Sequence, residues 1–133
     1  MLLDSLTLEE KKAFWNIANV LSAVDGRVDE EVSILKQYSE EMGVEFAFVD
    51  PATVDVASEL NSIKGGSLKD RKIIYFELFG VAYADTDCSD KEKAVLDQAA
   101  SALEITDDVR ATLEDCVKAI FDSYRKLGDV LNG

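Results

Sequence analysis

The sequence predicts an all-α fold, a compact single-domain bundle of about six or seven helices. Apolar residues recur at helical spacing along most of the chain, and no segment shows the sustained alternation that is typical of a half-buried strand. The chain has 133 residues, of which 47% are hydrophobic, and this is enough to bury one core without a metal or a disulfide. We therefore expect one domain over residues 1–133.

The first predicted helix begins at a capping box, in which the Thr7 hydroxyl and the Glu10 carboxylate satisfy backbone donors of the first turn. It runs to about Val24, and its apolar stripe is Phe14, Ile17, Ala18 and Leu21. The second helix starts near Val28 or Asp29 and ends at Gly43. Its expected core residues are Ile34, Leu35, Tyr38 and Met42.

A third helix is expected to connect the two halves of the chain. Asp50 is a good N-cap and Pro51 suits the first helical position, so the helix should start there. Gly65 and Gly66 end it, and its modest core face is Val54, Ala57 and Leu60.

The second half of the chain predicts three more helices. Ser67–Asp70 resembles a capping box, and the helix after it is apolar on nearly all sides, which indicates a central, buried helix. Another capping box, Ser89–Glu92, opens a helix whose inner face is Val95, Leu96, Ala99 and Leu103. Thr106 starts the last helix, which is expected to direct inward Val109, Leu113, Val117, Ile120 and Tyr124.

Two helix–acidic turn–helix repeats organise these elements. The first covers about 7–44 and the second about 67–106, with a connector over about 45–66 and a last helix over about 107–128. If the first turn is one residue shorter than the second, Glu31 matches Glu92 and Met42 matches Leu103. Acidic and apolar positions then fall into register together.

The net charge of −13, from 14 basic and 27 acidic residues, excludes several functions. Such a field repels nucleic acid and anionic lipid, whereas it attracts cations and basic protein partners. No apolar stretch approaches the ~20 residues that span a bilayer, and the first residues do not resemble a signal peptide, so we expect a cytoplasmic protein. The absence of histidine removes the commonest general base, and we expect no enzyme.

The second acidic turn carries oxygen ligands at alternate positions. Asp85, Asp87 and Ser89 alternate, and Glu92 follows on the first turn of the next helix. Oxygen-only sites suit calcium, magnesium or manganese. The turn is not an EF-hand, because Glu92 is the eighth residue from Asp85 and not the twelfth. Alternatively, the turns are helix caps only, since Asp29 and Ser89 are ordinary N-caps.

Two short acidic motifs, each followed by a glutamate on the next helix, are Val24-Asp25-Gly26 with Glu31, and Ala84-Asp85 with Glu92. In these residues the chain resembles the TerB-like family associated with bacterial tellurite resistance. Val24 replaces the family's usual alanine, and Thr86 replaces its usual glycine.

The resemblance implies a compact all-helical fold in which both turns contribute to a metal site. The candidate ligands are Asp25, Asp29, Glu31, Asp85, Asp87 and Glu92. We therefore expect a non-catalytic protein that binds a divalent cation, calcium, magnesium or manganese, and acts in tellurite or metal stress response. The alternative is an acidic protein–protein interaction module without a metal, which docks a basic protein partner.

Overall fold

The structure is a computed structural model that describes residues 2–23, 29–43, 47, 49–83 and 89–133, with only the backbone of residues 29–34. The described residues form helices and no strand, which confirms the all-α prediction. Two short 3-10 helices are η1 (Leu3–Ser5) and η2 (Pro51–Thr53). The α-helices are α1 (Leu8–Ala23), α2 (Asp29–Met42), α3 (Val56–Ile63), α4 (Leu68–Tyr83), α5 (Asp90–Ala102) and α6 (Asp107–Asn132).

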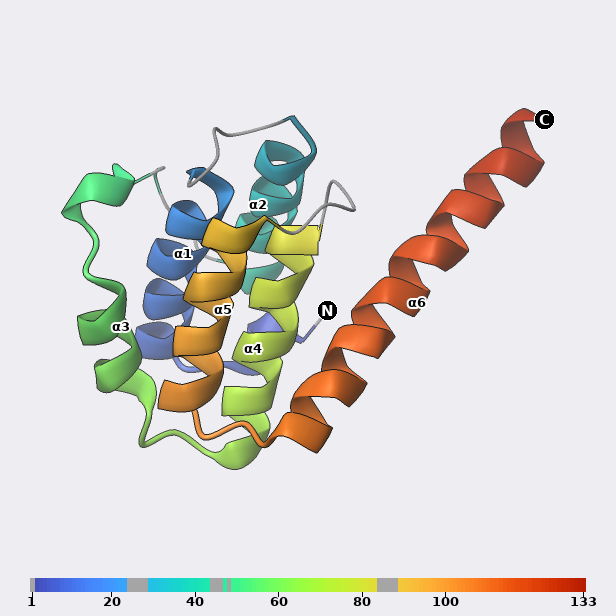
Figure 1. The fold of residues 1–133 in the computed structure, drawn as a ribbon. Helices are drawn as coiled ribbons and strands as arrows, with labels where there is room; N and C mark the ends of the chain where they lie inside the picture. Colours follow the sequence, from blue (N-terminus) through green and yellow to red (C-terminus); the bar gives the residue numbers. More distant parts are fainter. Residues whose placement is uncertain (1, 24–28, 44–46, 48, 84–88) are drawn as a thin grey trace.

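Two helix pairs make the centre of the bundle. Helix α1 contacts α2 and α4, and α4 contacts α5 and α6, while α3 packs against α1 and α5. Figure 1 shows that α6 starts beside α4 and then leaves the bundle, so that its second half projects away from the other helices. Helix α4 is the central helix, as predicted, because it touches α1, α2, α5 and α6 and buries most of its residues.

Helices α1 and α4 bury the same positions. Both have 16 residues, and α4 begins 60 positions after α1. From Ala13 on, each buried residue of α1 has a buried counterpart at the same place in α4, so the two helices present nearly the same face to the core. Glu10 is buried, whereas its counterpart Asp70 is partly exposed. The matched buried pairs include Phe14 and Ile74, Ala18 and Leu78, and Leu21 and Val81.

Helices α2 and α5 also match, with an offset of 61 positions. Leu35 and Leu96 are both buried, and so are Met42 and Leu103. Each helix is followed by a left-handed residue, Gly43 with φ 69° and Glu104 with φ 57°. The change of offset from 60 to 61 agrees with a first turn that is one residue shorter than the second.

The two pairs are closed by equivalent polar contacts. Lys11 Nζ of α1 donates to the backbone carbonyl of Met42, at 2.9 Å. Arg71 Nη1 of α4 donates to the backbone carbonyl of Leu103, at 2.8 Å, and its Nε donates to the carbonyl of Gly66, at 3.1 Å. In each pair a basic side chain of the first helix therefore satisfies a free carbonyl at the end of the second helix.

The prediction for the connecting helix was wrong at its start. Asp50 caps only the 3-10 turn η2, because its carboxylate accepts the N–H of Ala52. The N-cap of α3 is Asp55, which is extended and accepts the N–H of Ser58. This shift exposes Ala57, which was expected in the core, and buries Ile63 in addition to Leu60.

The prediction for the last helix was wrong in its length and in part of its inner face. Helix α6 continues to Asn132 and does not stop near residue 128. Val117 is buried, but Ile120 and Tyr124 are 39% and 68% exposed. Helical spacing predicted that both are buried, but α6 leaves the bundle in this region. Phe121, which was not predicted, packs against the core here.

Candidate functional site

The six predicted metal ligands are described to different extents. Asp25, Asp85 and Asp87 lie outside the described residues. Asp29 and Glu31 belong to the first turn of α2, but their side chains also lie outside the described part. Only the Glu92 side chain is described.

The helices that flank the two acidic turns share one end of the bundle. In Figure 1, α1 and α4 end at the top of the view, and α2 and α5 begin there. The helices on either side of residues 24–28 and of residues 84–88 therefore reach the same end of the fold. Since α1 contacts both α2 and α4, these ends belong to neighbouring helices.

Glu92 lies at this end and takes part in the predicted capping box. Its Oε1 accepts the N–H of Ser89, and the Ser89 hydroxyl accepts the N–H of Glu92, both at 3.1 Å. Glu92 is 5% exposed. The first helix has the same device, in which Glu10 and Thr7 bond reciprocally at 2.9 and 3.1 Å. Capping therefore helps to hold the Glu92 side chain in this conformation.

No group of three His, Cys, Asp or Glu side chains that could hold a metal ion occurs among the described residues. Of the six predicted ligand side chains, the described part of the chain includes only that of Glu92.

A cavity of about 400 Å³ lies between α4, α5 and α6. It mixes aromatic, basic and acidic side chains, and it reaches Tyr83, the last residue of α4 before the second acidic turn. Its lining residues are Phe79, Tyr83, Lys93, Leu96, Asp97, Arg110, Glu114 and Lys118.

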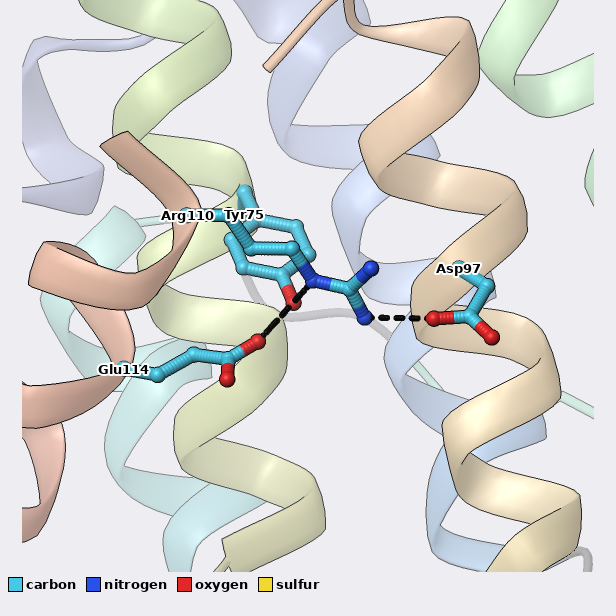
Figure 2. A network of polar contacts seen from close by, with 4 residues as sticks. All are labelled: Tyr75, Asp97, Arg110 and Glu114. Atoms are coloured by element: carbon cyan, nitrogen blue, oxygen red, sulfur yellow. Dashed lines mark hydrogen bonds and ion pairs between the residues drawn. The ribbon is translucent and has the colours of Figure 1, made fainter. Parts of the chain in front are cut away.

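Arg110 lines this cavity and is the centre of a polar network, which Figure 2 shows. Its Nη2 pairs with Asp97 Oδ1 at 2.7 Å, across to α5. Its Nε donates to the Tyr75 hydroxyl at 2.7 Å and to Glu114 Oε2 at 3.0 Å. The guanidinium also lies 5.4 Å from the centre of the Tyr75 ring. One arginine thus joins α4, α5 and the start of α6.

Tyr75 and Glu114 complete the network. The Tyr75 hydroxyl donates to Glu114 Oε2. Burial, and then the hydrogen bond with the Glu114 carboxylate, raise the pKa of Tyr75 well above its ordinary value. Tyr75 is therefore a protonated donor at neutral pH, and the charge of Arg110 is balanced by two carboxylates. This arrangement holds α6 in place.

Sequence reasoning missed this network. Arg110 and Glu114 stand four residues apart on one helix, a spacing that favours an ion pair. Nothing in the sequence indicates Asp97 or Tyr75 as their partners, because those contacts arise only when three helices are assembled.

A second polar position is buried in the middle of α4. Glu77 is buried, and its burial raises the pKa of its carboxyl group. The Tyr38 hydroxyl of α2 donates to the backbone carbonyl of Glu77, at 3.2 Å. A Cβ atom at Gly80 would lie 2.9 Å from that hydroxyl oxygen, so glycine makes room for Tyr38.

Comparison with known proteins identifies one family. A family model described as tellurite resistance protein TerB matches residues 4–115. No curated protein and no solved structure matches the chain. The matched range includes both acidic turns and ends within α6, so residues 116–133 follow it. In the described part of the chain, no helix is both long enough and apolar enough to cross a membrane.

Proposed function

This chain belongs to the TerB family, and on that premise we propose that it is a non-catalytic protein that binds one divalent cation through its two acidic turns. We place its role in tellurite or metal stress response. The family match covers well over half of the chain and includes both turns. The candidate ligands remain the six carboxylates of the turns.

The observation that carries the proposal is the shared end of the helices that flank the two turns (Figure 1). A hard divalent cation takes about six to eight oxygen ligands, and one turn supplies too few side chains. Turns at the same end of a bundle can contribute to one ion, whereas turns at opposite ends cannot. The fold therefore permits the shared site that the ligand count requires.

The chemistry of the candidate donors favours a hard cation. Carboxylate oxygens suit calcium, magnesium and manganese better than zinc or copper, which prefer nitrogen or sulfur. The net charge of −13 also raises the local concentration of cations.

Isothermal calorimetry on chelator-treated protein tests the proposal. We expect heat of binding for calcium, magnesium or manganese, and little for zinc. Asp25→Asn combined with Asp85→Asn should abolish that heat. A matched control removes two exposed carboxylates of α6, Asp115→Asn with Asp129→Asn, and should bind as the wild type does. No heat for any of the ions, or equal loss in the control, contradicts the proposal.

The second candidate function is an acidic interaction module that docks a basic protein partner. The capping box of Ser89 and Glu92 favours it, because helix capping gives a buried glutamate at the turn a structural role without a metal. On this alternative, Asp25→Asn with Asp85→Asn leaves the response to ions unchanged and weakens a complex recovered by affinity purification. The calorimetry therefore separates the two functions.

A further inference from the structure

An apolar seam runs along α6 and continues outside the bundle. Its residues follow one another at alternating intervals of four and three positions, which is the spacing of a coiled-coil seam. They are Leu113, Val117, Ile120, Tyr124, Leu127 and Leu131. All six lie on α6.

Only the first part of this seam is covered. Leu113 packs against the core and Val117 is 3% exposed. Beyond them, Leu127 and Leu131 are 51% and 73% exposed, on the half of α6 that projects from the bundle (Figure 1). Ile120 and Tyr124 are also exposed. A regular apolar seam on a projecting helix is a surface that fits a second helix.

The charge of the projecting segment differs from that of the rest of the chain. Residues 116–133 have three basic residues, Lys118, Arg125 and Lys126, against two acidic ones, Asp122 and Asp129, a net of +1. Residues 1–115 keep 11 basic and 25 acidic residues, a net of −14. The segment is thus the part of the molecule where two copies can meet with the least repulsion.

A cavity of about 240 Å³ lies at the base of the projecting segment, between α2, α4 and α6. Its apolar lining includes Phe76, Gly80 and Phe121, and its polar lining includes Glu41 and Glu77. Apolar side chains of the projecting segment of a second copy, such as Leu131, suit the apolar part of this lining.

We propose that two copies of this chain form an antiparallel dimer through the projecting halves of α6. An antiparallel pair keeps the two acidic bodies at opposite ends of the contact, whereas a parallel pair brings them side by side. With Tyr124 at the two-fold axis, Leu127 of one copy lies between the levels of Ile120 and Tyr124 of the other. Leu131 then reaches Val117, beside the cavity of the second copy.

The available surface agrees with a dimer of moderate affinity. The exposed apolar side chains of the segment leave on the order of 600 Å² uncovered in each copy. Two copies would bury roughly 1,200 Å², the lower end of the range for specific interfaces. We therefore expect a dissociation constant in the micromolar range. The segment follows the range matched by the TerB model, so the dimer does not depend on the proposed metal site.

Sedimentation equilibrium on the full chain tests the dimer. We expect the mass to rise from one to two chains with concentration, and Leu127→Asp to raise the dissociation constant about 100-fold or more, because the change occurs twice in the dimer. The control Asn132→Asp adds the same charge outside the seam and should change it little. Circular dichroism of dilute Leu127→Asp should match the wild type. A wild type that stays monomeric throughout, or a Leu127→Asp variant that dimerises normally, overturns the proposal.

Discussion

The α1–α2 pair and the α4–α5 pair share one framework but differ in what lies against it. Trp15 of α1 donates from its indole nitrogen to the carbonyl of Ala47, at 2.8 Å, in the segment that follows α2. Tyr75 stands at the equivalent position of α4 and bonds instead to Arg110 and Glu114 of α6. In both pairs this aromatic side chain therefore makes a hydrogen bond to the segment that follows the pair in the sequence.

The difference continues along the same faces. Asn19 of α1 accepts the N–H of Val49 at 3.2 Å, whereas the equivalent residue of α4 is Phe79, which packs in the core. Ile17 is apolar, whereas its counterpart Glu77 is a buried acid. The two helices therefore bury equivalent positions, but their polar side chains stand at different positions and have different partners. One acidic turn lies between the two helices of each pair.

Truncation of equivalent buried leucines in the two pairs should have the largest effect on the free energy of unfolding, and a similar effect in each pair. Leu35→Ala and Leu96→Ala remove equivalent buried side chains, and each should lower the free energy of unfolding by about 3 kcal/mol. Urea unfolding followed by circular dichroism measures both. The control is Ala119→Ser, a change at an exposed position of α6. It should change the free energy of unfolding by less than about 0.5 kcal/mol. A loss under about 1 kcal/mol at one leucine only would break the equivalence of the pairs.

The hydrogen bonds that Arg71 and Lys11 donate to backbone carbonyls should contribute differently to the free energy of unfolding. Arg71→Met removes two hydrogen bonds to carbonyls, those of Gly66 and Leu103, and should cost about 2 kcal/mol. Lys11→Met removes one bond, to the carbonyl of Met42, and should cost about 1 kcal/mol. The same urea unfolding experiment measures both variants. If Lys11→Met costs more than Arg71→Met, the number of bonds does not decide the effect.

Tyr75→Phe should affect the second pair alone. It removes the hydroxyl that bonds to Arg110 and Glu114, and should cost about 1 kcal/mol. Amide hydrogen exchange should become faster in the first turns of α6 and remain unchanged in α1 and α2. Equal acceleration in α1 would show that Tyr75 does not act through α6.

Glu77, the buried acid at the position equivalent to Ile17, should make the free energy of unfolding depend on pH, and Glu77→Gln should remove that dependence. Because burial raises the pKa of Glu77 in the folded chain, the contribution of this group to stability is full below its ordinary pKa of 4.5 and is lost as the pH rises through the raised value. Glutamine cannot ionise. The unfolding free energy of the variant, relative to the wild type, should therefore increase as the pH rises from about 4 to about 8. A constant difference over this range contradicts a raised pKa at Glu77.

Much of the framework could be predicted from the sequence because it depends on local signals. Capping boxes at Thr7 and Ser89 and the apolar run of α4 are readable from neighbouring residues, and the structure has them. The alignment of Met42 with Leu103 used the same apolar spacing, and both residues are buried.

The remaining features depend on how the helices are placed relative to one another. Helical spacing could not indicate that Ile120 and Tyr124 project beyond the bundle, because the stripe continues unchanged. Asp50 and Asp55 can both cap a helix, and the sequence did not indicate that Asp55 is the one that starts α3. For the candidate metal site, the ligand types could be read from the sequence, while the placement of five of the six side chains lies outside the described part.

The most direct test of the central claim, that the two unequal turns hold one ion together, is the calorimetric stoichiometry of single variants. The account predicts one calcium, magnesium or manganese ion per wild-type chain, and strongly weakened binding in both Asp25→Asn and Asp85→Asn. Two ions per chain, of which each variant loses one, would contradict a shared site. So would a variant of either turn that binds as tightly as the wild type.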